Sequence, residues 1–218
     1  MEQVVTLRTR DVAVCLLVAS ECKCTFSKIQ LQKLIYLMDV LSACLDIVSV
    51  ENGHITYHHG PYDKNIQNAA DMLVFWELAD VINIRSNEKG IMCEYFLTDI
   101  GLEWIIELIA TDSNTNKRYE ICKNLVYSLT YRNQMKNLVP LVYAEPIFVK
   151  NKSMGYGVEL NINDLNSNDF YLLVLLLLDA YQIKNTEGLT AFFCDFIVDY
   201  LSMRKVALAM REWENEDA

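Results

Sequence analysis

The chain has 218 residues, of which 52% are hydrophobic and 22% are charged, and its net charge is −10. This length and composition suffice for a substantial core and exclude a disordered chain. The net charge opposes long-range steering of the whole molecule to nucleic acid and favours protein partners. The longest apolar run, residues 170–178, is about half of the roughly 20 residues that cross a bilayer, so no membrane-spanning segment and no membrane partner are predicted.

Charge is distributed unevenly along the chain. Residues 1–116 hold 8 basic and 16 acidic side chains, residues 117–152 hold 7 and 2, and residues 153–218 hold 4 and 11. Only the middle segment is basic, so contacts with phosphate groups, if the protein makes any, are expected there. The candidate residues are Lys117, Arg118, Lys123, Arg132 and Lys136.

The seven cysteines are odd in number, lie mostly within apolar runs, and follow no secretory signal. They are therefore interpreted as reduced core residues of a cytoplasmic protein. Cys22 and Cys24 form one Cys-x-Cys pair, but a zinc site of this kind needs a second pair, which is missing.

The first half of the chain predicts alternating helices and short strands. Ser27, followed three residues later by Gln30, has the form of a capping box, so a central helix is expected to begin there. Other helices are expected at residues 4–19, 63–78 and 98–109, with Asp63 and Thr98 as N-caps. Alternating residues predict a strand at 54–58 and a hairpin formed by 81–84 and 92–97.

The resulting order of helix, helix, strand, helix, hairpin and helix is typical of a winged helix-turn-helix. The stretch from Tyr95 to Gly101 also resembles the Tyr-x-Leu-Thr-x-x-Gly end of the wing in many bacterial winged-helix regulators. Residues 1–112 are therefore predicted to form a winged-helix domain.

A polar break at residues 112–117 predicts a second domain at 117–218, mostly helical with a small hairpin. Helices are expected at 119–138, from 168 or 169 to 178, and at 189–212, with a non-helical passage between Pro140 and Pro146. The hairpin is expected to pair 147–149 with 156–162. Residues 170–178 are apolar on nearly every helical face, which predicts a central position. The predicted fold class is mainly α with a small β part.

Two further motifs carry a family resemblance. Residues 31–37 read Leu-Gln-Lys-Leu-Ile-Tyr-Leu, and residues 59–62 read His-Gly-Pro-Tyr. These pieces resemble the Panacea (SocA-like) antitoxin domain and the middle components of three-gene, Lamassu-like antiphage systems built around an ABC or SMC-like ATPase. The resemblance covers roughly residues 25–104, and the long hydrophobic C-terminal half departs from the Panacea pattern. It implies protein binding in a hetero-oligomer, either neutralising a toxin or bridging an ATPase and an effector nuclease.

His54, His58 and His59 are the only histidines, and the first two share one face of the expected strand. Zinc needs three or four ligands, and no further ligands occur at matching spacing, so polar packing around a turn is the simpler interpretation. Cysteine–histidine pairs for nucleophilic chemistry can form in space, but no local sequence singles one out. The prediction is that the chain is not an enzyme and has no cofactor, with an unrecognised hydrolase as a rival.

The candidates for contacting a protein partner are Lys33, His59, Tyr62 and Trp213. Lys33 is expected to point to solvent beside Lys28, Tyr62 either holds the third helix to the core or presents its ring to a partner, and Trp213 is an exposed aromatic anchor. The predicted function is an adaptor subunit, with an antitoxin and a DNA-binding transcriptional regulator as alternatives. Residues 63–80 hold one lysine against four acidic residues, which disfavours base reading by the third helix. DNA contact would then be non-specific and made through the complex.

Overall fold

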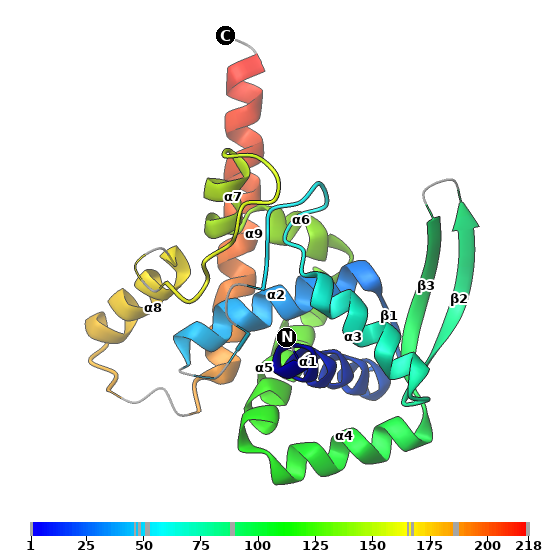
Figure 1. The fold of residues 1–218 in the computed structure, drawn as a ribbon. Helices are drawn as coiled ribbons and strands as arrows, with labels where there is room; N and C mark the ends of the chain where they lie inside the picture. Colours follow the sequence, from blue (N-terminus) through cyan, green and yellow to red (C-terminus); the bar gives the residue numbers. More distant parts are fainter. Residues whose placement is uncertain are drawn as a thin grey trace.

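The fold is mainly helical with a small three-stranded antiparallel sheet, which confirms the predicted mainly α, small β class (Figure 1). The computed structural model describes residues 2–45, 47, 49–50, 53–87, 90–164, 166, 168–184 and 188–216, without the side chains of 2–5, 87, 90 and 212–216. The turn of the hairpin, at residues 88–89, therefore lies outside the described residues.

The N-terminal half contains the four predicted helices and the predicted hairpin. Its helices are α1 (Glu2–Glu21), α2 (Lys28–Cys44), α3 (Lys64–Phe75) and α4 (Asp99–Thr111), and its strands are β1 (Phe26–Ser27), β2 (Ala79–Asn87) and β3 (Gly90–Leu97). The sheet order is β1-β3-β2, with Phe26 paired to Tyr95 and Ala79 paired to Leu97. Sequence patterning did not predict β1, because a two-residue strand has no detectable alternation.

The predicted helix caps are all present. Ser27 and Gln30 form a capping box at the start of α2. The Asp63 carboxylate accepts a hydrogen bond of 2.8 Å from the backbone amide of Asn65, and the Thr98 hydroxyl accepts one of 3.1 Å from that of Gly101. These side chains satisfy amides that the helix itself leaves unpaired, and so fix where α2, α3 and α4 begin.

The C-terminal half consists of α5 (Ser113–Tyr131), the 3-10 turn η1 (Met135–Asn137), α6 (Leu138–Tyr143), α7 (Pro146–Lys152), α8 (Asp169–Ala180) and α9 (Thr190–Glu216). Helix α5 packs against α1, α2, α4 and α9, and the buried core runs without interruption from α1 to α9. Asp112 caps α5, which begins at the next residue. Helix α5 thus belongs to the same core as α1 and α2, and the boundary between domains 1–112 and 117–218 stays a prediction.

One predicted strand and one predicted hairpin are wrong. Residues 54–58 do not join the sheet; Ile55 instead bridges Tyr62 and Glu159. The predicted hairpin of 147–149 with 156–162 does not form, because 146–152 is helical. The chain after it pairs with the loop at 54–56: Thr56 donates its amide to Val158 and Leu160 donates to His54, each over 2.8 Å. Extended segments far apart in sequence pair here, which local patterns cannot predict.

The predicted non-helical passage between the two prolines is also wrong. Pro140 lies within the first turn of α6, and Pro146 is the first residue of α7, whose N-cap is Glu145. Neither proline removes a hydrogen bond there, because the first amides of a helix have no partner inside the helix. The predicted helix at 119–138 ends earlier, at Tyr131, and the separate 3-10 turn η1 follows at Met135–Asn137.

Helix α8 has the predicted N-cap, Asn168, but not the predicted central position. It lies at the edge of the molecule (Figure 1) and buries only Phe170 and Val174, while Leu172, Leu175 and Leu176 are 40%, 42% and 67% exposed. The core is instead organised around α2, which contacts α1, α3, α5, α6 and α8.

Candidate partner-binding site

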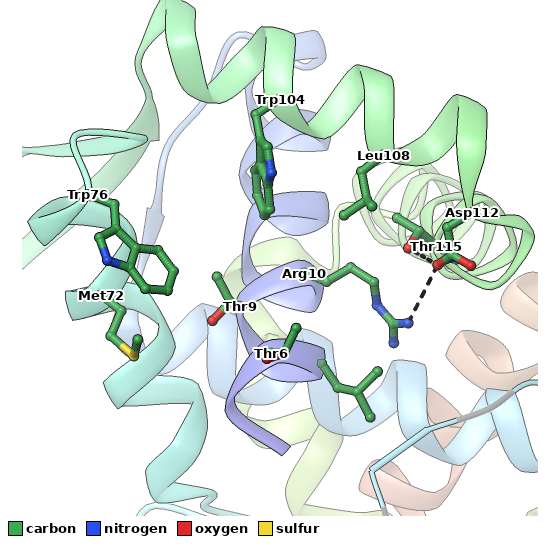
Figure 2. Close-up of a pocket in the computed structure, with 10 residues that line it drawn as sticks. Thr6, Thr9, Arg10, Met72, Trp76, Trp104, Leu108, Asp112 and Thr115 are labelled. Atoms are coloured by element: carbon green, nitrogen blue, oxygen red, sulfur yellow. Dashed lines mark hydrogen bonds and ion pairs between the residues drawn. The ribbon is translucent and has the colours of Figure 1, made fainter. Parts of the chain in front are cut away.

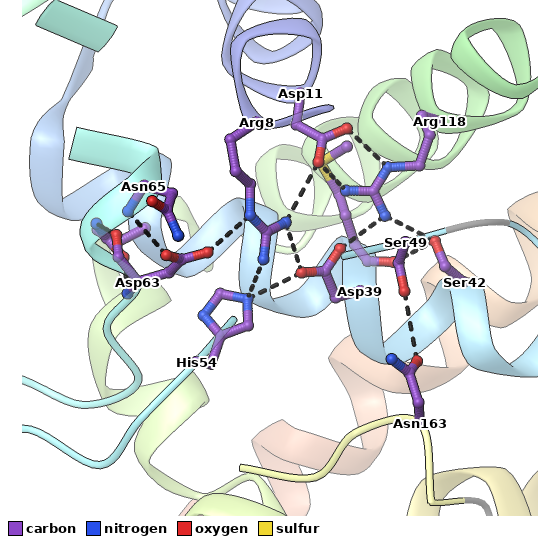
Figure 3. Close-up of polar contacts among 12 residues, drawn as sticks. Arg8, Asp11, Asp39, Ser42, Ser49, His54, Asp63, Asn65, Arg118 and Asn163 are labelled. Atoms are coloured by element: carbon purple, nitrogen blue, oxygen red, sulfur yellow. Dashed lines mark hydrogen bonds and ion pairs between the residues drawn. The ribbon is translucent and has the colours of Figure 1, made fainter. Parts of the chain in front are cut away.

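A buried network of charged side chains joins three helices at the centre of the molecule (Figure 3). The Arg8 guanidinium of α1 donates to Asp63 over 2.7 Å and to Asp39 of α2 over 2.8 Å. Arg118 of α5 donates to Asp11 of α1 through two nitrogens, at 3.0 and 2.8 Å. All of these side chains are at most 1% exposed. The network therefore fixes α1, α2 and α5 relative to one another and to the start of α3.

The network also fixes the state of His54. Burial lowers the pKa of His54, which keeps the imidazole neutral. Burial alone would raise the pKa of Asp39, but the positive charges of Arg8 and Arg118 lower it well below its usual range. An ionised carboxylate only accepts hydrogen bonds, so the His54 Nε2, 2.9 Å from Asp39, carries the proton. A sealed and paired group of this kind stabilises the fold and has no access to a substrate.

A second set of contacts explains why the two motifs at 31–37 and 59–62 occur together. The Gln32 amide exchanges two hydrogen bonds with the backbone of Asp63, of 2.8 and 2.9 Å. The Lys33 ammonium donates to the carbonyl of Pro61 over 2.8 Å. Adjacent side chains of α2 thus hold the Gly-Pro-Tyr loop, and the loop presents Asp63 to Arg8. Lys33 does not point to solvent as predicted, because it is 2% exposed.

The structure brings three of the four predicted partner contacts together. Lys33, His59 and Tyr62 line one small pocket beside α2. Tyr62 is half-buried and its ring centroid is 5.2 Å from that of Tyr57. The fourth candidate, Trp213, has a side chain outside the described residues.

A hollow of about 670 Å³ is lined by residues of α1, α4, α5 and the end of α3 (Figure 2). Trp104 extends from α4 toward α1, and Trp76 lies across from it beside Met72 at the end of α3. A neighbouring hollow of about 260 Å³ shares Trp104 and Leu108. We call the hollow of about 670 Å³ the tryptophan pocket. Its lining is Thr6, Leu7, Thr9, Arg10, Met72, Trp76, Trp104, Leu108, Asp112 and Thr115.

The width of the tryptophan pocket depends on the motif at 95–101. Thr98 donates its hydroxyl to the carbonyl of Glu77 over 2.8 Å. A Cβ added at Gly101 would lie 1.8 Å from the carbonyl oxygen of Leu78, so only glycine allows this approach. The motif therefore holds α4 against the chain that follows α3, and sets the positions of Trp76 and Trp104.

The walls of the tryptophan pocket are apolar and its surroundings are acidic. Trp76 is 48% exposed and is followed by exposed Glu77, while Trp104 lies between exposed Glu103 and Glu107. Residues 65–84 and 99–112 together hold seven carboxylates and no lysine or arginine. At its inner end Arg10 is bound to Asp11 over 3.2 Å and lies 4.0 Å from Asp112. The pocket therefore suits an apolar side chain with positive charge beside it.

The predicted phosphate contacts are only partly available. Lys117, Lys123 and Lys136 are exposed. Arg118 is fully buried, so its predicted surface role is wrong. Arg132 binds Asp199 over 2.6 and 2.9 Å and Asp195 over 2.8 Å. Two of the five candidates are thus committed to contacts within the protein.

Within the described residues, no group of three or more histidine, cysteine, aspartate or glutamate side chains is arranged to hold a metal ion. The histidines are separated by environment, since His54 is buried in the charge network while His58 and His59 are exposed. Across the same residues, no helix has the length and apolarity to span a membrane.

Sequence reasoning missed Arg8, Asp11 and the tryptophan pocket. The signal for the first two was present: Arg8 and Asp11 stand three residues apart at the edge of a long apolar run, where a helix would bury both. Trp76 and Trp104 carried no comparable signal, because their proximity depends on how α3 and α4 meet.

Comparison with known proteins adds no family. No family model matches the chain, and no curated protein is significantly similar to it.

Proposed function

We propose that the chain is a non-enzymatic adaptor subunit that binds protein partners in a bacterial toxin-control or antiphage assembly. Its partners would be a toxin, or an ATPase together with an effector subunit. The observation that carries this proposal is the tryptophan pocket, a hollow of about 670 Å³ that is lined by exposed Trp76 and half-buried Trp104. Tryptophans in such hollows are typical centres of binding energy in protein interfaces.

The proposal names the chemistry of the segment that the pocket receives. An amphipathic segment with one large apolar side chain flanked by lysine or arginine fits the apolar walls and the adjoining carboxylates of Glu77, Glu103 and Glu107. Attraction between these charges speeds association and excludes acidic partners. It also weakens as salt rises, because exposed charges are screened over about 10 Å at 0.1 M salt.

We also propose that residues 1–112 are a winged-helix domain. The order α1, β1, α2, α3, β2, β3, α4, with the sheet order β1-β3-β2, supports this assignment. In such a domain α3 would be the helix offered to DNA. Its one basic residue is Lys64, and its Asp71 is paired with Lys28 over 3.3 Å. These features favour a domain adapted to protein contacts.

The test is co-expression of the chain with the products of its neighbouring genes, followed by co-purification. Trp104→Ala is expected to reduce the recovered complex at least about tenfold, since loss of a central tryptophan costs about 2 kcal/mol or more. Tyr131→Ala is the matched control, because Tyr131 is 78% exposed on α5 and lies outside the pocket. Equal recovery with both variants would overturn the placement of the interface.

Charge reversal provides a second, independent arm. Glu103→Lys with Glu107→Lys is expected to weaken the complex most at low salt, whereas Glu120→Lys, an exposed carboxylate of α5, should leave it unchanged. An unchanged complex in the double variant would contradict a basic partner segment.

A further inference from the structure

We infer that Lys33, Tyr57, His59 and Tyr62 form a binding site for a single carboxylate group carried on an apolar body. This site is separate from the tryptophan pocket and does not depend on the adaptor function. It rests on three observations: a buried ammonium without a counter-ion, a small hollow beside it, and the absence of carboxylates from that hollow's lining.

The first observation is the unmatched charge of Lys33. Its side chain is 2% exposed, and its one hydrogen bond among the described residues is the 2.8 Å bond to the Pro61 carbonyl. An ammonium has three donors, so two remain unused. Arg8, Arg118 and Arg132, by contrast, are each paired with at least one carboxylate. Burying an unpaired charge is unfavourable, and a bound anion would remove that cost.

The protonation of Lys33 agrees with this geometry. Burial lowers the pKa of Lys33 to about 8. At pH 7 the side chain therefore still carries its proton and can bind an anion, while above pH 8 it increasingly does not. A bound carboxylate favours the charged form and raises the pKa toward the ordinary value of lysine.

The second observation is a hollow of about 170 Å³ beside the ammonium. The rings of Tyr57 and Tyr62 lie 5.2 Å apart and form an apolar wall. Gly60 has a positive φ of 87°, and a Cβ there would lie 3.0 Å from Lys33 Nζ and 2.6 Å from the ring of Tyr143. The loop therefore approaches the ammonium as closely as glycine permits. The full lining is Lys28, Ile29, Gln32, Lys33, Tyr57, His59, Gly60, Tyr62 and Gln67.

The third observation is the charge of this lining. Its titratable groups are lysine, histidine and tyrosine, with no carboxylate among them. Lys28 is matched by Asp71, 3.3 Å away, which leaves Lys33 as the one uncompensated lysine of the lining. A single ammonium between aromatic rings suits a monoanion with an apolar body. A phosphate group would call for more donors or an arginine fork, which the lining lacks.

A carboxylate of this kind can belong to a small organic acid or to the C-terminus of a polypeptide. The probe for the first source is benzoate, with neutral benzamide as its control. The probe for the second is the peptide Ala-Ala-Ala-Phe with a free C-terminal carboxylate, compared with the same peptide amidated. Each is titrated into the intact protein, with the Lys33 side-chain resonance followed by NMR across pH 6 to 10.

The expected result is that benzoate, the free peptide, or both raise the pKa of Lys33, whereas the neutral compounds do not. Lys33→Met is expected to weaken binding at least about tenfold, because it removes the charged donor that the carboxylate would accept from. Lys117→Met, which changes an exposed lysine of α5 outside the hollow, should bind as the wild type does. Because Lys33→Met removes a contact to the loop, the wild-type titration decides the question if that variant unfolds.

A Lys33 pKa that responds to none of the probes would overturn the inference. Equal responses to benzoate and benzamide, or tighter binding of inorganic phosphate than of benzoate, would overturn it as well. Loss of the co-purified complex in Trp104→Ala bears only on the adaptor function, so the two proposals fail separately.

Discussion

Helices α2 and α8 are both rich in apolar residues, yet α2 is mostly buried and α8 is mostly exposed or half-buried. Helix α2 buries Gln32, Lys33 and Asp39 along with its leucines, whereas α8 exposes Leu172, Leu175 and Leu176. The difference lies in their neighbours. Helix α2 is surrounded by α1, α3, α5, α6 and α8. Helix α8 lies at the edge of the molecule, where it contacts α2, α7 and, through Phe170, the Phe196 and Tyr200 rings of α9. Apolar composition alone therefore does not locate the core.

Buried charges and exposed leucines are each unfavourable on their own, and α2 and α8 differ in how these groups are compensated. Charged groups buried around α2 are tolerated because Arg8 and Arg118 match Asp11, Asp39 and Asp63. These ion pairs fix the positions of α1, α2 and α5 relative to one another. The leucines exposed on α8 have no match within the described residues, and exposed apolar clusters commonly mark an interface. We expect the C-terminal half to lose part of this surface in an assembly.

The largest effect is expected from breaking the buried network. Arg118→Met leaves Asp11 and Asp39 without one of their cations, which should lower the free energy of unfolding by about 3–5 kcal/mol. Arg132→Met is the control, because its ion pairs are partly exposed and should contribute about 1 kcal/mol or less. Urea unfolding at pH 7 measures both. Equal losses would mean that the network does not stabilise the core in the way described.

The next effect concerns pH and Lys33. Its pKa is lowered to about 8 in the folded protein, so the unfolded state binds more protons between pH 8 and about 10.5. Stability from this group should therefore rise with pH across that window, by up to about 3 kcal/mol. Lys33→Met should remove this rise, whereas Lys28→Met should retain it. Parallel pH profiles for wild type and Lys33→Met would contradict the buried, charged state of Lys33.

Gly101→Ala tests the contact that sets the tryptophan pocket. The added Cβ must move α4 away from the Leu78 carbonyl, at a cost of about 1–3 kcal/mol. The variant should also bind its partner more weakly, because Trp104 moves with α4. Gly155→Ala is a control for the steric clash, since nothing lies within 4 Å of a Cβ added there. Its φ of 115° adds backbone strain of its own. Thermal unfolding and co-purification together would show whether stability and binding change as expected.

The smallest effect on stability, with a clear effect on assembly, is expected from α8. Leu176→Lys changes a side chain that is 67% exposed, so the free energy of unfolding should change by no more than about 0.5 kcal/mol. The same charge should weaken association with a partner or a second copy. Light scattering measures assembly, and circular dichroism checks folding. Unchanged assembly would exclude this face of α8 from the interface.

Whether a feature could be predicted from the sequence depends on how far apart in the chain the residues that determine it lie. The caps at Ser27, Asp63 and Thr98 are set by the next three residues, and all were predicted correctly. The pairing of 54–56 with 157–160 joins segments about a hundred residues apart, and it was missed. The same limit explains the exposed position assigned to Lys33, since the Pro61 carbonyl that holds it comes from a loop 28 residues away.

The most direct test of the adaptor proposal is an NMR measurement of the tryptophan indole N–H groups in the free protein and in its co-purified complex. The chain has three tryptophans, and Trp76→Phe and Trp104→Phe assign the two that line the pocket. Insertion of an apolar side chain from the partner should shift both resonances and slow their exchange with solvent, and the shifts should disappear when the partner's apolar side chain is replaced by alanine. A stable complex in which the Trp76 and Trp104 indoles keep the resonances and exchange rates of the free protein would contradict the proposed use of the tryptophan pocket.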